Sequence, residues 1–143
     1  MSDLYDTDFY AWANEQAALL RAGKLSVADI AHIAEEIDSM GRSERRELTS
    51  RLAVLLTHLL KWQVQPERRG RSWLLTIREQ RREVAEVLAD NPSLRARLSE
   101  LLAEAYGKAL LAAQRETDLP EEAFPAASPW TFDEAMQDAP DGA

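Results

Sequence analysis

The sequence of 143 residues contains no cysteine. Disulfide bonds and thiolate metal sites such as zinc fingers are therefore excluded. Long apolar runs are also lacking, because the longest, residues 52–60, is interrupted by His58 and is too short to span a bilayer. Where a secretory signal needs positive charge, the amino terminus carries Asp3, Asp6 and Asp8. We expect a cytoplasmic protein that does not enter a membrane.

Several catalytic signatures are missing as well. The sequence has no glycine-rich phosphate loop, no nucleophile elbow and no zinc-ligand spacing. Few segments alternate apolar and polar residues with period two, which argues against a β-sheet. These absences favour a non-enzymatic helical protein without a cofactor. An enzymatic function remains the alternative.

Charge is distributed unevenly along the chain, whose net charge is −8. Residues 1–40 carry a balance of −6, residues 41–82 of +7 and residues 83–143 of −9. Because salt screens exposed charges beyond about 10 Å at 0.1 M, the acidic flanks neutralise the middle only if they fold against it. We expect internal pairing; the alternative is a basic middle that faces an anionic partner.

The clearest pattern that is present is helical and is centred on residues 43–65. One helical face there carries five apolar residues at alternating spacings of four and three, namely Leu48, Leu52, Leu55, Leu59 and Trp62. Gly41 and Ser43 predict a break and a capping residue before this helix, and Pro66 predicts its end. We expect this helix to be the most buried element.

Four further amphipathic helices are predicted around the central one. Gly23 is expected to end the first, and Ser26 with Asp29 resembles a capping box that starts the second. Asn91 and Pro92 separate the last two. The predicted ranges are 8–22, 26–41, 72–90 and 91–115. Five helices joined by short loops predict an all-α antiparallel bundle over residues 1–116.

Residues 117–143 differ in composition from the rest of the chain and are predicted to form a proline-rich tail. Its prolines are Pro120, Pro125, Pro129 and Pro140. A capped turn is expected at residues 131–134. We expect the tail to be fastened to the bundle by its aromatic side chains, Phe124, Trp130 and Phe132.

Several motifs resemble, in order, a bacterial family of unknown function, domain-of-unknown-function family twenty-nine. They are Asp8-Phe9-Tyr10-Ala11-Trp12, Glu35-Glu36-Ile37, Met40-Gly41-Arg42-Ser43, His58-Leu59-Leu60-Lys61-Trp62, Gln65-Pro66, Ser72-Trp73, Thr76-Ile77-Arg78-Glu79-Gln80-Arg81 and Pro92-Ser93-Leu94. The resemblance extends to about Pro129. It implies an α-helical bacterial protein, and it implies no activity.

Asp29, His32 and Glu36 fall within one narrow arc of the predicted second helix. Carboxylates and an imidazole at spacings of three and four are compatible with metal ligation inside a helical bundle, and His58 would add a second imidazole. The paired Glu-x-x-His repeats of di-iron bundles are absent, however. The competing interpretation is a hydrogen-bonded network with arginines of the next helix, and we expect no stoichiometric metal.

A basic cluster follows the central helix and is a candidate anion-binding surface. Its members are Arg68, Arg69, Arg71, Arg78 and Arg82. Arg81 instead borders the apolar face of its helix, where a partner carboxylate is expected, and Glu36 has the matching position on its own helix. We therefore predict a structural ion pair between Glu36 and Arg81.

Arg51 and His58 are seven residues apart and lie on one helical face. This spacing loosely resembles the Arg-to-His motif of ribonuclease domains in toxin–antitoxin systems, where the histidine acts as acid or base and the arginine stabilises phosphate. The alternative is an Arg51–Glu47 ion pair, with His58 covered and hydrogen-bonded to a neighbouring helix. Our leading interpretation is a non-enzymatic interaction module that binds a protein partner or itself, ahead of an RNA-acting enzyme or binding of nucleic acid.

Overall fold

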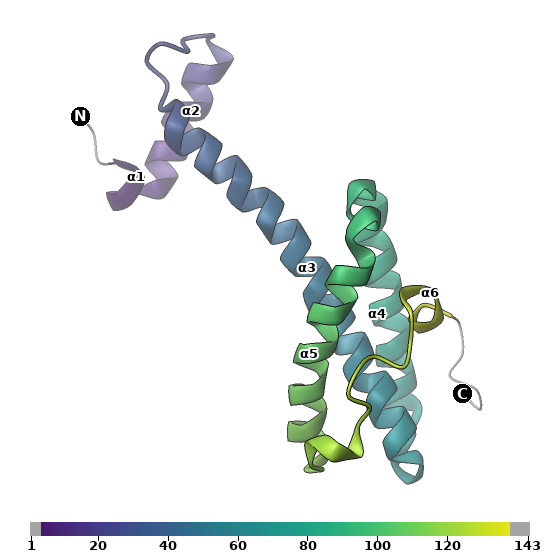
Figure 1. Cartoon of the computed structure of the whole chain (residues 1–143). Coiled ribbons are helices and arrows are strands. Elements are labelled where there is room, and N and C mark those ends of the chain that lie inside the picture. Colours follow the sequence, from purple (N-terminus) through teal and green to yellow (C-terminus); the bar gives the residue numbers. More distant parts are fainter. Residues whose placement is uncertain (1–3, 138–143) are drawn as a thin grey trace. The chain divides into compact units, whose positions relative to one another are not determined.

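The computed structural model describes residues 4–137, which contain helices and no strand (Figure 1). Asp3 and Pro140 lie outside this range. The elements, with 3-10 helices labelled η, are α1 (Leu4–Thr7), α2 (Phe9–Arg21), α3 (Ile30–Val64), η1 (Pro66–Arg68), α4 (Arg71–Asp90), η2 (Pro92–Arg97), α5 (Leu98–Thr117), η3 (Glu121–Ala123) and α6 (Phe132–Ala135). The predicted all-α class is confirmed. The finer prediction, one antiparallel bundle of about five helices, is not.

The chain divides into two compact units, residues 4–43 and residues 44–137, which we call the N-terminal and C-terminal units. The boundary falls inside α3, so this helix supplies residues to both. The sequence predicted no boundary at this point. The predicted division into a bundle over 1–116 and a tail over 117–143 stays a prediction.

Helix α3 also corrects the sequence-based boundaries. The segments expected as separate helices, 26–41 and 43–65, form one helix from Ile30 to Val64, and Gly41 lies inside it. A glycine within a helix costs about 1 kcal/mol relative to alanine, which weakens a helix of this length without ending it. The expected start at Ser26 is also wrong, because the helix begins after Asp29.

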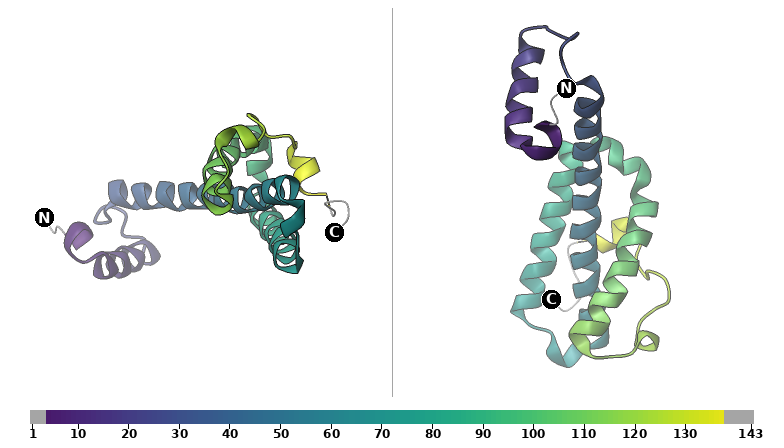
Figure 2. Two further views of the ribbon diagram at one scale, coloured as in Figure 1. Left: turned by 90° about the horizontal axis from the view of Figure 1, so that it is seen from below. Right: turned by 90° about the vertical axis from the view of Figure 1, so that its left-hand side faces the viewer.

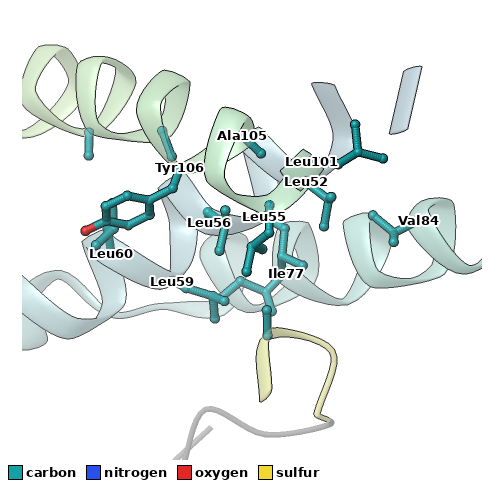
Figure 3. Packing of buried hydrophobic residues seen from close by; sticks show 14 of the residues in the cluster. Leu52, Leu55, Leu56, Leu59, Leu60, Ile77, Val84, Leu101, Ala105 and Tyr106 are labelled. Atoms are coloured by element: carbon teal, nitrogen blue, oxygen red, sulfur yellow. The ribbon is translucent and has the colours of Figure 1, made fainter. Parts of the chain in front are cut away.

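The core of the C-terminal unit is built on the predicted leucine face of α3. Leu48, Leu52 and Leu55 are fully buried, and Figure 3 shows the cluster formed with side chains of α4 and α5. Those partners include Ile77, Val84, Leu88, Leu101, Ala105 and Tyr106. The prediction that this part of the chain is the most buried is confirmed.

The tail packs against this core through the aromatic residues expected from the sequence. Phe124 is buried, and Trp130 and Phe132 are partly buried against the core cluster. The short helix α6 begins with a capping box, in which Thr131 and Glu134 each bond the other's backbone N–H. The predicted capped turn is confirmed.

The N-terminal unit is a helical hairpin, made of α2 and residues 30–43 of α3 (Figure 2). Asp8 caps α2 by accepting a hydrogen bond from the backbone N–H of Ala11 at 3.0 Å. Gly23 ends the helix with a φ of 72°, a conformation that glycine adopts without steric cost, as the sequence predicted. We use the name hairpin for this element below.

Candidate functional site

The Asp29 carboxylate joins the two helices of the hairpin. Its Oδ1 accepts a hydrogen bond from the backbone N–H of His32 at 3.3 Å, which caps α3. Its Oδ2 accepts from the indole Nε1 of Trp12 at 3.1 Å and lies 2.7 Å from Nδ1 of His32. Gln16 adds a further contact, because its Oε1 accepts a hydrogen bond from the Asp29 backbone N–H at 2.6 Å. We call the group formed by Asp29, Trp12 and Gln16 the clasp. The bond from His32, followed by that from Trp12, lowers the pKa of Asp29.

Tyr5 covers this clasp from the α1 side. Its ring stacks on His32 with 3.9 Å between the ring centroids, and it meets the edge of Trp12 at 4.8 Å. The Tyr5 hydroxyl donates a hydrogen bond to the Glu36 carboxylate. That bond to Glu36 is the main reason why the pKa of Tyr5 is raised to about 12. The polar side chains of this corner therefore bond one another.

An open groove of about 380 Å³ lies between the two helices of the hairpin. We call it the hairpin groove. Helix α2 contributes Phe9, Trp12, Ala13, Gln16, Ala17 and Leu20, and α3 contributes Ile33, Glu36, Ile37 and Met40. Eight of these ten side chains are apolar, so the groove offers mainly van der Waals and hydrophobic contacts to an occupant.

The apolar groove side chains are exposed to an unusual degree. Exposed fractions reach 48% for Phe9, 41% for Leu20, 61% for Ile37 and 66% for Met40. Within residues 4–43, only Trp12 and Gln16 are buried. The hairpin therefore has almost no core of its own, and one broad apolar face is left open to solvent.

The residues proposed from the sequence as a metal site are not gathered into one group. Asp29 and His32 contact each other, Glu36 is bonded by Tyr5, and His58 belongs to the C-terminal unit. In residues 4–137, no three His, Asp or Glu side chains are arranged to hold a metal ion. Asp29 lies close to His32 because it caps α3 through the His32 backbone N–H and contacts the His32 ring, which stacks on Tyr5.

Arg51 and His58 have separate local partners on α3. Arg51 Nε donates to Glu47 Oε1 at 2.8 Å, which confirms the expected ion pair one turn away. His58 is half-buried, and its Nδ1 bonds the Val54 carbonyl oxygen of its own helix at 2.9 Å. The expected bond to a neighbouring helix is wrong, because one helical turn places Val54 within reach. Burial lowers the pKa of His58.

Within the exposed basic cluster, Arg69 is the member that contacts the end of α3. Arg69 Nε donates to the Trp62 carbonyl oxygen at 2.7 Å, and its guanidinium lies 5.2 Å from the Trp62 ring centroid. Arg71, Arg78 and Arg82 are exposed, and their spacings of seven and four place them on one face of α4. For these three, no ion pair is recorded within residues 4–137. Arg68 is exposed in η1.

Some of the positive charge in residues 41–82 is neutralised by the acidic last third of the chain. Arg45 Nη2 lies 3.2 Å from both Glu100 Oε1 and Glu104 Oε1. Lys61 is buried, and its Nζ lies 2.7 Å from Glu116 Oε1 and 4.8 Å from the centroid of the Trp73 ring. The expectation of internal pairing is thus met at these positions.

The ion pair predicted between Glu36 and Arg81 stays a prediction. In the structure the Glu36 carboxylate accepts the Tyr5 hydroxyl, and Arg81 Nε donates to the Ala135 carbonyl oxygen at 2.9 Å. Each side chain therefore has a partner inside its own unit.

The hairpin groove was missed by the sequence analysis. Helical periodicity shows that these residues are apolar on one face, and the sequence predicts that such a face packs into one common core. A signal was available in the length of the hairpin, because about forty residues rarely bury enough surface to fold alone. A second pocket, of about 490 Å³, was also missed; it lies between α5 and the tail, next to Tyr106 and Trp130.

Comparison with known proteins gives one match. The model of the family described as "Domain of unknown function DUF29" matches residues 4–139. No curated protein and no solved structure matches the chain. The helices of residues 4–137 include none that has both the length and the apolar character of a membrane span.

Proposed function

Since the chain belongs to the family Domain of unknown function DUF29, whose description names no activity, we propose a function from the geometry of the hairpin. The protein is a non-enzymatic, helical protein-binding module, and its contact surface is the hairpin groove. The observation that carries this proposal is the open apolar face of a unit that buries only Trp12 and Gln16 among residues 4–43. We place the module in the bacterial cytoplasm.

The energetics of the groove favour an occupant. Burial of apolar surface contributes about 25 cal/mol per Å², so covering the exposed parts of Ile37 and Met40 is favourable. Monomeric proteins rarely expose large contiguous apolar patches, and those that do use them for binding. The clasp formed by Asp29, Trp12 and Gln16 holds the two helices together, so the groove is present before the occupant arrives.

The arrangement of the groove side chains fits a helix as occupant. Phe9, Ala13 and Leu20 recur at helical spacing along α2, while Ile33, Ile37 and Met40 do so along α3. Two such rows, side by side, form the furrow into which the apolar side chains of a third helix pack. A small polar ligand would find few partners there, because Gln16 and Glu36 are already hydrogen-bonded.

Photo-crosslinking in bacterial cells tests this proposal. Benzoylphenylalanine is incorporated at Ile37 in the groove and, as a matched control, at Leu111, which is 62% exposed on α5 outside the hairpin. We expect a protein adduct from position 37 that is absent from position 111. Equal labelling at both positions, or no protein adduct from position 37, contradicts the proposal.

A second candidate function is binding of nucleic acid, favoured by the exposed arginines of α4. Arg71, Arg78 and Arg82 form one row, and phosphates are bound by such rows in a strongly salt-dependent manner. Filter binding of a mixed-sequence RNA at low and high salt tests it. Changing the three arginines to glutamine is compared with Arg21→Gln, an exposed arginine of α2. Loss of salt-sensitive binding in the triple variant alone supports this candidate.

A further inference from the structure

We infer that the occupant of the hairpin groove is the hairpin of a second copy of this chain, docked head to tail. The two hairpins then form a four-helix bundle around a twofold axis. This inference rests on the proposed function, because it names the partner of the same groove.

The groove is suited to self-association because its two ends carry matching apolar residues. Leu20 lies at the end of α2 near the interhelical loop, and Phe9 lies at the other end of the same helix. A twofold axis across the middle of the groove sets α2 of each copy antiparallel to α2 of the other, which places Leu20 of each copy against Phe9 of the other. Such an interface is closed, so that it produces a dimer and no filament.

Charge on the hairpin is segregated along its length, and this decides the orientation. The loop end carries Arg21 and Lys24. The other end carries a single base, Arg42, and five acids from α1, the cap of α2 and helix α3. These acids are Asp6, Asp8, Glu35, Glu36 and Asp38. Head-to-tail docking brings the basic end of each copy to the acidic end of the other. Head-to-head docking places like charges together, which costs free energy.

The exposed apolar area is of the size that a dimer requires. Phe9, Leu20, Ile37 and Met40 are each about half exposed or more, which leaves about 100 Å² per side chain. Two copies together bring about 800 Å² of apolar surface. A standard protein interface buries about 1,600 Å², of which a little over half is apolar. The surrounding polar residues of both helices supply the remainder.

Sedimentation equilibrium of the full chain over a range of concentrations is the first experiment. The mass is expected to rise from 16.1 kDa to twice that value as concentration increases. Ile37→Asp places a charge in the groove of each copy and is expected to raise the dissociation constant at least about a hundredfold. Leu111→Asp, the control on α5, is expected to leave it unchanged. Circular dichroism checks that both variants keep their helices.

Disulfide trapping tests the orientation, and the absence of native cysteine removes any background. Leu20→Cys and Phe9→Cys are prepared as separate single variants and then mixed under oxidising conditions. Head-to-tail docking is expected to yield the mixed Leu20→Cys/Phe9→Cys disulfide as the main product, because the antiparallel α2 helices bring these two positions together, as disulfide formation requires. Like-with-like disulfides as the main products contradict the orientation.

The outcomes separate this inference from the proposed function. If the chain is monomeric and position 37 crosslinks to a different protein in cells, the inference of a second copy is wrong. The proposed protein-binding function of the groove is then retained. A monomeric chain that gives no adduct at all overturns both. A dimer that Ile37→Asp leaves intact, while Arg78→Glu dissociates it, moves the interface to α4 and also overturns the inference.

Discussion

At the scale of single residues, Asp29 shows how one carboxylate organises the hairpin. It receives the Trp12 indole from α2 and caps α3 through the His32 backbone, so both helices depend on it. The same oxygen that contacts the indole also contacts the His32 ring. Because these donors favour the ionised carboxylate, they lower its pKa, and protonation is expected to loosen the clasp.

We predict that the Trp12 indole proton reports the titration of Asp29. The folded pKa lies below the ordinary value of 3.8, so the stabilisation is complete above 3.8 and is lost as pH falls through the folded pKa. The indole resonance, followed by NMR from about pH 6 to about pH 2, should shift with a midpoint below 3.8. In Asp29→Asn that shift should be absent. A midpoint above 3.8 contradicts the clasp.

His58 provides the second prediction at this scale. Its folded pKa lies below the ordinary 6.5, mainly because burial disfavours the charged ring. As pH falls below 6.5, His58 becomes protonated in the unfolded chain while it stays neutral in the folded chain. The free energy of unfolding therefore decreases. Denaturant unfolding should show a smaller decrease between pH 8 and pH 5 in His58→Gln, which lacks this ionisable ring.

The same variant tests the RNA-acting alternative. Arg51 and His58 each bond a partner on their own helix, and a structural role is enough to explain both residues. We therefore expect no RNA cleavage that depends on His58. A cleavage activity that is lost in His58→Gln, with the fold intact, contradicts this expectation.

At the scale of elements, two glycines of the N-terminal unit have opposite roles. Gly23 ends α2 with a φ of 72°, whereas Gly41 lies within α3 and has no atom within 4 Å of an added Cβ. We predict that Gly41→Ala stabilises the protein by about 0.5–1 kcal/mol, because the helix loses its most flexible residue without a clash. Gly23→Ala should destabilise it by about 1–2 kcal/mol, owing to its left-handed backbone. Thermal unfolding followed by circular dichroism measures both. Equal signs contradict the assignment.

These glycines also show what the sequence could predict. Periodicity identified every long helical segment, since the apolar spacing survives in α2, α3, α4 and α5. It failed at Gly41, because the sequence does not reveal the φ of a glycine, and glycine typically ends a helix by adopting a left-handed φ. Asp29 is a second example. The sequence placed it in a capping box at Ser26, but its contacts with Trp12 and Gln16 depend on how α2 folds back.

The contacts of the candidate metal-binding residues could not be predicted for a related reason. Asp29, His32 and Glu36 lie at helical spacing at the start of α3, as the sequence predicts. Tyr5 from α1, however, donates a hydrogen bond to Glu36 and stacks on the ring of His32. A residue brought in from another element cannot be read from helical spacing. The hairpin groove was missed because hydrophobic periodicity shows which face is apolar and does not show what covers it.

At the scale of the whole molecule, the two units differ sharply in how much apolar surface they bury. The C-terminal unit has an extended core with fully buried leucines from α3 and partners on α4 and α5. The N-terminal unit buries Trp12 and leaves the groove side chains open. Since burial supplies most of the stability of a domain, the two units are expected to open with different free energies.

The last prediction joins this difference to self-association. Amide hydrogen exchange measured by mass spectrometry should show slow exchange at residues 48–60, 77–88 and 101–113 at every protein concentration, because their protection comes from within one chain. Protection of residues 9–20 and 33–40 should increase with protein concentration, because a second copy binds only the folded hairpin and stabilises it by mass action. Ile37→Asp should remove that concentration dependence without changing exchange in the core. Concentration-independent protection of the hairpin in the wild-type chain would mean that its groove does not bind a second copy.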